Sequence, residues 1–147
     1  MIEKIYIDWE DFGIAIDELV EEINSSVYPM YDGVYGFPRG GLPVAVALSH
    51  KLRIPFINNI DDVTDDTLIV DDINDTGKTL KNISIFNDIA TIYSAPWSIV
   101  NPTFFVRYKV LKESWIIFPW ENWNTEGELN TEENDMEEIQ TTIPDFE

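Results

Sequence analysis

The sequence predicts an α/β domain with a mostly parallel central sheet flanked by helices. Segments with strand character alternate with helical segments, and glycine-containing turns separate some of them. Residues 67–72 are apolar on both faces, which is typical of a strand buried in a parallel sheet. The 147 residues include no cysteine, and 44% of them are hydrophobic, so one core forms without disulfides.

A helix is the first element that the sequence predicts. It begins near Asp8, which caps the helix while Asp11 occupies the third helical position. Apolar residues then recur at helical spacing and predict a face packed in the core: Phe12, Ala15, Ile16, Leu19, Val20 and Ile23.

A strand–turn–helix unit follows. Residues 33–37 have the pattern of a short buried strand, and the turn Pro38-Arg39-Gly40-Gly41 interrupts it. A second helix opens at Leu42-Pro43 and stops by Pro55, as proline at the start of a helix favours.

The same pattern then repeats. The sequence predicts a strand over 54–59, an acidic turn over 61–66, the strand 67–72, a helix over 80–86, strands over 89–94 and 103–111, and an aromatic segment over 115–123. Ligands of such sheets bind beyond the carboxyl ends of the strands. Both the turn 38–41 and the segment 71–79 are expected there.

The segment from Leu68 to Leu80 carries the most chemical information. An apolar strand ends in Asp71 and Asp72, whose side chains point to opposite sides of the strand. The loop that follows offers a glycine, hydroxyls, an amine and free backbone N–H groups, which together predict a phosphate-binding loop: Asp75, Thr76, Gly77, Lys78 and Thr79.

Two other interpretations of this loop are weaker. A P-loop of the nucleotide hydrolases requires glycine at position 72, where this chain has aspartate. A surface turn that only caps a helix does not explain why paired acids, hydroxyls and glycine follow an apolar strand together.

The segment resembles the phosphoribosyl diphosphate (PRPP) binding motif of type I phosphoribosyltransferases. That motif has an apolar strand, two acids, two variable residues, Asp-Thr-Gly and a hydroxyl residue. Residues 4–23 with Trp9, the turn 36–43 and residues 115–121 extend the resemblance, which is to bacterial xanthine-guanine enzymes over roughly residues 3 to 121. It implies a phosphoribosyltransferase domain over 1–121 with a small hood at 112–121, followed by an acidic tail over 122–147.

The resemblance also implies roles for individual residues. Arg39, Gly40 and Gly41 would bind the pyrophosphate of PRPP, and Thr76, Gly77, Lys78 and Thr79 would hold its 5′-phosphate. Asp71 and Asp72 would meet the ribose hydroxyls and Mg²⁺, and Asp75 would act as general acid/base near purine N7. Trp115 would stack on the base, whose edge would be read by backbone groups at Ile116.

The activity implied is transfer of 5-phosphoribose from PRPP to a purine-like base, with release of pyrophosphate, in purine salvage. The cofactor would be Mg²⁺, and the assembly a homo-oligomer, either dimer or tetramer. Such a reaction needs cations that hold the leaving group and a nucleophile held in line. Arg39 and Lys78 lie in the two expected phosphate loops.

Two features depart from the family pattern. Members that use 6-oxopurines carry a lysine where this chain has Ala95, so we expect weak or relaxed discrimination among 6-oxopurines, with Lys109 and Lys112 as the next candidates for reading the base. The family also covers its site with a mobile loop of about twenty residues, whereas only residues 58–66 are available here. Either this lid is short, another segment covers the site, or turnover is inefficient.

Charge and composition narrow the classes of partner. A net charge of −19 opposes broad binding to nucleic acid or anionic lipid, and ten acids without Lys or Arg lie in the stretch 121–147. The single histidine, His50, is expected to be an ordinary packing or surface residue. No apolar run suits a membrane span and the start lacks a signal pattern, so we expect a cytoplasmic protein.

Two alternatives to an active transferase remain open at this point. One is a catalytically weak or inactive regulatory module that binds PRPP or a nucleotide. The other is a structural or inhibitory protein whose acidic tail imitates nucleic acid.

Overall fold

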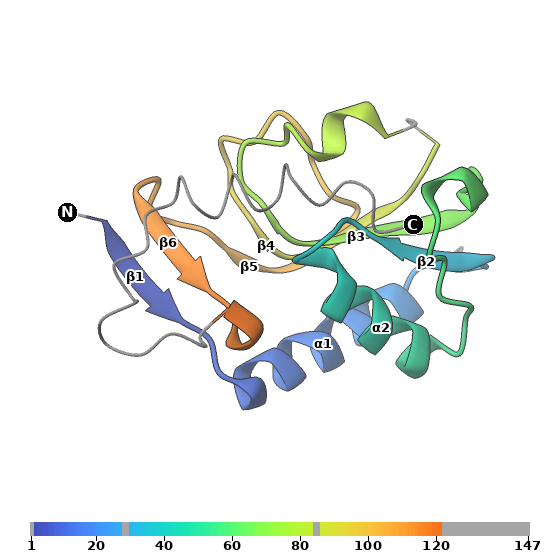
Figure 1. Ribbon diagram of the computed structural model, residues 1–147, viewed down its shortest axis with the longest axis horizontal. Coiled ribbons are helices and arrows are strands. Elements are labelled where there is room, and N and C mark those ends of the chain that lie inside the picture. The colour runs from blue at the N-terminus through green and yellow to red at the C-terminus, as the bar shows by residue number, and fades with distance from the viewer. Residues whose placement is uncertain (1, 28–29, 84–85, 122–147) are drawn as a thin grey trace.

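The computed structural model describes residues 2–27, 30–83 and 86–121 (Figure 1). Two helices, six strands and three 3₁₀ turns follow one another in this part of the chain: β1 (Glu3–Tyr6), α1 (Trp9–Asn24), β2 (Gly33–Gly36), α2 (Gly41–Leu52), η1 (Ile60–Asp62), β3 (Thr67–Asn74), η2 (Leu80–Asn82), β4 (Ile89–Ser94), β5 (Phe104–Tyr108), β6 (Ser114–Ile117) and η3 (Pro119–Glu121).

The strands form two separate parallel sheets. The larger sheet has the order β2-β3-β4-β5, and all three of its pairings are parallel. β1 pairs with β6 in a sheet of two strands, which lies at one end of the molecule in Figure 1. The prediction of an α/β fold with a mostly parallel sheet is therefore confirmed.

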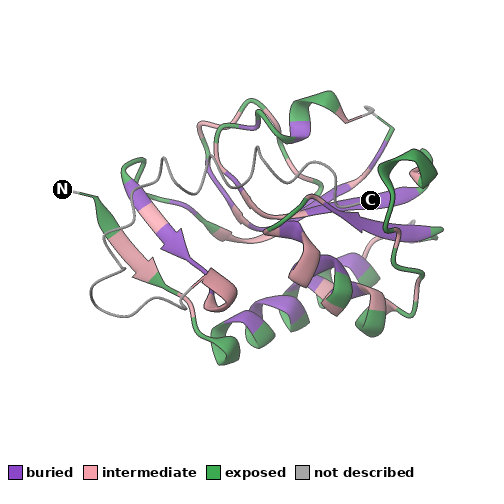
Figure 2. Ribbon diagram, viewed as in Figure 1, coloured by how far each residue is buried: buried purple, intermediate pink, exposed green. Residues whose placement is uncertain are grey.

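The larger sheet is covered on both faces. Leu68 and Val70 belong to the main core, which α1 and α2 close from one side (Figure 1). Ile69 instead packs in a second cluster with Tyr35, Leu80 and Ile89. This alternation follows from the two-residue period of a strand and explains why β3 is apolar on both faces, as its buried colour in Figure 2 shows.

α1 begins as the sequence predicts. The Asp8 carboxylate accepts the Asp11 N–H at 2.8 Å, and the Asp11 carboxylate accepts the Asp8 N–H at 3.3 Å, which completes a capping box. Five of the six residues of the predicted stripe are buried, and Val20 is partly buried against the same core: Phe12, Ala15, Ile16, Leu19 and Ile23.

Three predicted elements are shorter than expected, among them the strand expected over 103–111, which is β5 (Phe104–Tyr108). Residues 54–59 contribute one isolated bridge, between Phe56 and Val34, in place of a strand. The helix expected over 80–86 is a single 3₁₀ turn, because after Leu80–Asn82 the backbone of Ile83 is already extended. Residues 84 and 85 lie outside the described part of the chain.

The hood contains a strand that the sequence did not indicate. β1 has four residues and no clear alternation, and it becomes a strand by pairing with residues more than 100 positions away. Phe118 stacks on Trp120 with ring centroids 4.8 Å apart, and Phe12 of α1 meets Trp120 edge to face at 5.1 Å. This aromatic cluster fastens the hood to the main domain.

The boundary at residue 121 stays a prediction. The acidic tail expected over 122–147 lies outside the described residues, as does the end of the aromatic segment at Trp123. Within the described chain, neither helix has the length and apolar character needed to cross a bilayer.

Candidate active site

The turn after β2 lies against the carboxyl end of β3. The Phe37 N–H donates to the carbonyl oxygen of Val70 at 3.2 Å, and the Gly41 N–H donates to the Phe37 carbonyl at 2.8 Å. The Pro38–Arg39 peptide bond is cis, and the Arg39 side chain is exposed. The turn therefore presents a free guanidinium next to the end of β3.

Two glycines are required for this close approach. A Cβ atom at Gly40 would collide with the Asp72 carboxylate, and one at Gly41 would lie 2.8 Å from the Val70 carbonyl oxygen. The predicted pyrophosphate turn and the predicted ribose and metal residues are thus in direct contact. A side chain at either glycine would separate them.

Asp71 and Asp72 are both half-buried at the end of β3. Burial, and then the charge of Asp72, raise the pKa of the Asp71 carboxyl well above its ordinary value, and burial raises the pKa of Asp72. Each carboxylate accepts the N–H of the residue that follows it, at 2.9 Å and 2.8 Å. Two adjacent buried carboxylates of this kind favour a nearby cation.

The chemistry of the donor set fits Mg²⁺ held together with a phosphorylated substrate. No group of three or more His, Cys, Asp or Glu side chains that could hold a metal occurs among the described residues. Mg²⁺ commonly takes one or two carboxylates and completes its shell with water and substrate phosphates. Asp71 and Asp72 suit that arrangement.

The loop after β3 has the form expected of a phosphate-binding loop. Gly77 has a φ of +86°, a conformation that other residues rarely adopt. Around it the side chains of Thr76, Lys78 and Thr79 are exposed, and the Lys78 N–H donates to the Thr76 hydroxyl at 3.3 Å. Hydroxyls and an ammonium therefore surround the glycine where an anion would bind.

Asp75 is held at both of its carboxylate oxygens. Oδ1 accepts the indole N–H of Trp97 at 2.9 Å, and Oδ2 accepts the ammonium of Lys109 at 2.7 Å. The Asp75 side chain is 40% exposed, whereas that of Lys109 is 6% exposed. The carboxylate is therefore partly exposed to solvent, and the hydrogen bonds from Trp97 and Lys109 set its orientation. Sequence reasoning proposed no role for Trp97.

A cation is present at Asp75 although position 95 lacks one. Ala95 is buried, and its N–H donates to the carbonyl of Asn74 at 2.8 Å. Lys109 follows the end of β5 and brings its ammonium to Asp75, while Lys112 is exposed. The parallel pairing of β4 with β5 brings Lys109 there, since its N–H donates to the Ser94 carbonyl at 3.0 Å.

Trp115 and Ile116, the predicted base-binding residues, lie on β6 in the hood. Trp115 is partly buried, and the Lys4 ammonium lies 5.3 Å from its ring centroid. Ile116 is buried and belongs to the main core. The indole of Trp115 is therefore held by β1 before any ligand binds.

Glu121, at the end of η3, lies near the site, and sequence reasoning gave it no role although it placed the residue in the hood 112–121. Its carboxylate accepts the Phe118 N–H at 3.0 Å. Burial and, to a smaller extent, the charge of Asp72 raise the pKa of Glu121 to about 7, against the lowering effects of the Phe118 hydrogen bond and of the charge of Arg39. The end of the hood therefore lies within electrostatic reach of the turn 38–41 and of β3. The signal that could have found Glu121 is its position directly after an apolar strand and turn.

The short segment 58–66 does not lie at the site. It leads into the amino end of β3, where the Thr64 hydroxyl bonds Asp32 and the Asn87 amide donates to the carbonyls of Thr64 and Thr67 at 2.8 Å each. Since the site lies at the other end of β3, this segment cannot serve as its cover.

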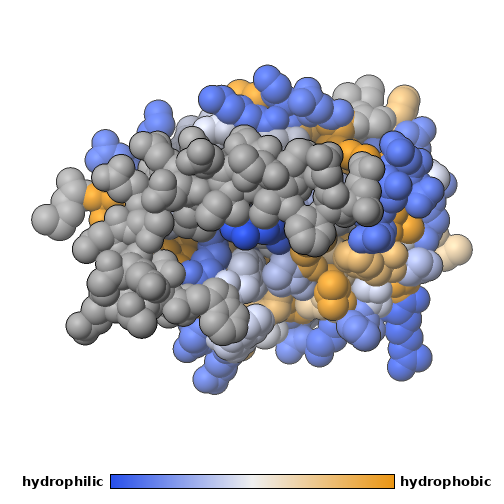
Figure 3. All heavy atoms as spheres, in the orientation of Figure 1, coloured by the Kyte–Doolittle hydropathy of each residue, from blue (hydrophilic) through white to orange (hydrophobic). Residues whose placement is uncertain are grey.

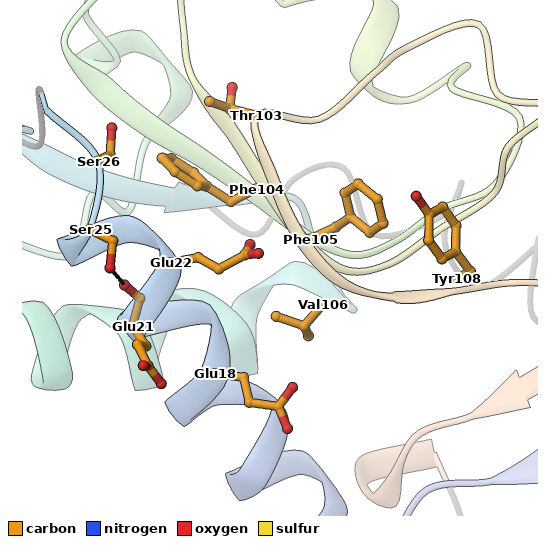
Figure 4. Close-up of a pocket in the computed structure, with 10 residues that line it drawn as sticks. All are labelled: Glu18, Glu21, Glu22, Ser25, Ser26, Thr103, Phe104, Phe105, Val106 and Tyr108. Carbon is orange, nitrogen blue, oxygen red and sulfur yellow. Dashed lines mark hydrogen bonds between the residues drawn. The ribbon is translucent and has the colours of Figure 1, made fainter.

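A large groove of about 820 Å³ also lies apart from the site. Figure 4 shows that it runs between α1 and β5 and that three glutamates of α1 border it: Glu18, Glu21 and Glu22. None of its lining residues is a predicted site residue. Hydrophilic side chains also occupy most of the visible margin of the molecule in Figure 3, as the net charge of −19 leads one to expect.

Comparison with known proteins agrees with this geometry. No family model matches the chain. A xanthine-guanine phosphoribosyltransferase of Idiomarina loihiensis is 27% identical over 143 residues, which cover 80% of this chain and 87% of that protein. The crystal structure of a purine phosphoribosyltransferase from Pyrococcus horikoshii is 32% identical with a TM-score of 0.68, and the match covers 84% of this chain and 97% of that one.

A more distant structure shares the fold. The xanthine-guanine-hypoxanthine phosphoribosyltransferase of Helicobacter pylori is 16% identical with a TM-score of 0.64, over 95% of this chain and 99% of that one. The fold is that of a parallel α/β protein, in which ligands bind beyond the carboxyl ends of the strands, where the paired acids and the phosphate-type loop lie. The similarity to these proteins makes the assignment specific: the chain belongs to the type I phosphoribosyltransferase family.

Proposed function

We propose that this protein transfers 5-phosphoribose from PRPP to a purine base and releases pyrophosphate, as a step of purine salvage. The observation that carries the proposal is that three predicted parts of one site adjoin one another at the carboxyl end of β3: the turn 38–41, the acids Asp71 and Asp72, and the loop 75–79. Gly40 packs on Asp72, and the loop with Asp75 and Gly77 follows β3 directly. The related purine phosphoribosyltransferases support the same reaction.

The phosphates of PRPP would be held at two places. Arg39 and the backbone at Gly40 and Gly41 would bind the pyrophosphate, while residues 76–79 would bind the 5′-phosphate with hydroxyls, an ammonium and N–H groups. Asp71 and Asp72 would hold the ribose hydroxyls and Mg²⁺. When bound, the metal neutralises charge that develops on the leaving pyrophosphate.

The base would lie between the hood and Asp75. Trp115 would stack on its ring and backbone groups of Ile116 would read its edge, as the resemblance implies. Asp75 would take the proton from purine N7 while N9 of the same ring forms the bond to C1 of ribose and pyrophosphate leaves. The Asp75 carboxylate is 40% exposed and can be reached by a ligand, while Trp97 and Lys109 donate to its two oxygens and set its orientation.

The partners that we propose are PRPP, Mg²⁺ and a purine, in a homo-oligomer located in the cytoplasm. Nucleic acid and membranes are not proposed as partners. A net charge of −19 repels polyanions, and a small anionic substrate then depends on local cations such as Arg39 and Lys78.

A panel of bases tests the proposal. Guanine, xanthine, hypoxanthine, adenine, uracil and orotate are each supplied with PRPP and Mg²⁺, and released pyrophosphate is measured. We expect turnover with at least one purine and none with the pyrimidines. If PRPP binds but no base gives pyrophosphate, the protein is a binding module and the proposed activity is wrong.

A further inference from the structure

Two side chains from separate segments meet at Asp75. Trp97 and Lys109 each donate to a different oxygen of its carboxylate, at 2.9 Å and 2.7 Å. The Lys109 ammonium also lies 6.0 Å from the centroid of the Trp97 ring. A single donor would leave the carboxylate free to rotate about its bond to Cβ, whereas two donors on different oxygens fix the plane of the group.

The backbone that carries Trp97 has no regular secondary structure, yet it is tightly held. Residues 95–100, here called the 95–100 segment, surround the side chain of Asn74, which is 1% exposed. The Asn74 amide nitrogen donates to the Val100 carbonyl at 2.8 Å and to the Ser94 hydroxyl at 3.1 Å. Its amide oxygen accepts the Ser98 hydroxyl at 2.8 Å. One buried amide thus holds Ser98 and the Val100 end of the segment, together with Ser94 just before the segment begins.

The same segment packs on the phosphate-type loop. The Ile99 N–H donates to the Thr76 carbonyl at 3.2 Å. A Cβ atom at Gly77 would lie 2.7 Å from the Ser98 hydroxyl and 2.8 Å from the Ile99 side chain. The 95–100 segment therefore contacts Asp75 through Trp97 and supports Gly77 through Ser98 and Ile99.

We propose that Trp97 is a positioning residue for Asp75, and that the 95–100 segment couples the orientation of Asp75 to the order of the loop at 76–79. The inference rests on the proposed function. A group that exchanges a proton with a substrate must be held within a narrow range of positions, and a small misplacement can cost about 100-fold in rate. Trp97 supplies that restraint, and the segment that carries Trp97 also packs against the phosphate-type loop.

The first experiment replaces Trp97 by phenylalanine, which keeps an aromatic ring but removes the indole N–H. The proposal expects kcat to fall about tenfold or more while the KM for PRPP changes less than about twofold. The matched control is Trp9→Phe, since Trp9 is exposed and its rings meet Phe12 and Trp120, away from Asp75. An unchanged kcat in Trp97→Phe, or an equal loss in both variants, would overturn the inference.

The second experiment needs no turnover. The indole N–H resonance of Trp97 is assigned in the ¹⁵N-labelled full chain and followed in Asp75→Asn and on addition of PRPP with Mg²⁺. The proposal expects this resonance to move in both cases, and to move more than that of Trp9. If it responds to neither change, the inference is wrong whatever the kinetics of Trp97→Phe.

Failure of the proposed function gives a different result. In that case the unaltered protein turns over none of the bases, so the loss precedes any substitution. A protein that is active, and whose Trp97→Phe variant is equally active, contradicts the positioning role alone.

Discussion

At the scale of single residues, the ion pair between Lys109 and Asp75 serves stability and chemistry together. An ammonium that is 6% exposed requires a partner, because an unpaired buried charge costs several kcal/mol. Asp75 satisfies it while remaining 40% exposed. Substitution at Asp75 therefore affects the folded state as well as the proposed proton transfer.

Asp75→Asn is expected to lose most turnover and to keep PRPP binding. Asparagine has nearly the same size and its oxygen can still accept from Lys109 or Trp97, but it no longer takes a proton. Since proton transfer contributes about 10²- to 10⁴-fold, kcat should fall by at least about 10²-fold. The melting temperature should fall by a few degrees because Lys109 loses its counter-charge. A kcat equal to that of the unaltered protein would remove Asp75 from the proposed role.

Lys109 is the candidate for selecting the base. A buried ammonium beside Asp75 can donate to a keto oxygen, and it meets the amino group of adenine unfavourably. We predict that Lys109→Met lowers kcat/KM for the preferred 6-oxopurine about tenfold relative to adenine, about 1.4 kcal/mol. Lys112→Met, at an exposed position, is the control. If the ratio of kcat/KM for the 6-oxopurine to kcat/KM for adenine is equal in all three proteins, groups other than Lys109 select the base.

At the scale of elements, local patterns predicted those parts of the fold whose partners lie nearby in the sequence or whose faces are strongly apolar. The capping box of α1 and the bounds of β4 agree with the prediction, as does the burial of β3 on both faces. β1 is recognised as a strand only from its pairing with β6, since four residues carry too little pattern to indicate a strand.

The candidate site likewise has one part that local sequence patterns predicted and one part that they did not. Asp71 to Thr79 are contiguous, so their spacing predicted one loop. The contacts of Asp75 with Trp97 and Lys109 join residues 22 and 34 positions apart. They depend on how β4, β5 and the 95–100 segment pack, which no local pattern records. Glu121 received no predicted role for the same reason, because its burial comes from the fold.

The loop around Gly77 gives a prediction at this scale. Gly77→Val places a β-branched side chain at positive φ and against Ser98 and Ile99, so the loop must shift. Nucleoside monophosphate should then stop raising the melting temperature, whereas it raises that of the unaltered protein. The control is Gly13→Ala in α1, where a Cβ meets nothing within 4 Å. Equal stabilisation by the ligand in both variants would contradict binding of phosphate at this loop.

At the scale of the whole molecule, the net negative charge and the burial of carboxyl groups both lower stability as the pH rises. Burial raises the pKa of Asp71, Asp72 and Glu121 above their ordinary values. For each group the folded state keeps its proton to higher pH than the unfolded chain does. Their contribution to stability is therefore full below the unfolded pKa and is lost as the pH rises through the folded pKa. A net charge of −19 adds self-repulsion at neutral pH.

Glu121 allows this loss to be measured at one residue. Its pKa rises from 4.5 to about 7, so its contribution disappears between pH 4.5 and about pH 7. The shift corresponds to roughly 3 kcal/mol at most, and access of water to the half-buried carboxyl reduces this to about 1–2 kcal/mol.

Glu121→Gln keeps an oxygen for the Phe118 N–H but does not ionise. Relative to the unaltered protein, the variant should therefore gain about 1–2 kcal/mol of unfolding free energy as the pH rises over this range. Urea unfolding of both proteins at pH 4.5, 5.5, 6.5 and 7.5 measures the difference, with the exposed Glu113→Gln as control. Parallel curves for Glu121→Gln and the unaltered protein would mean that Glu121 has the same pKa in the folded and unfolded states, and that its carboxyl is not buried at the end of the hood.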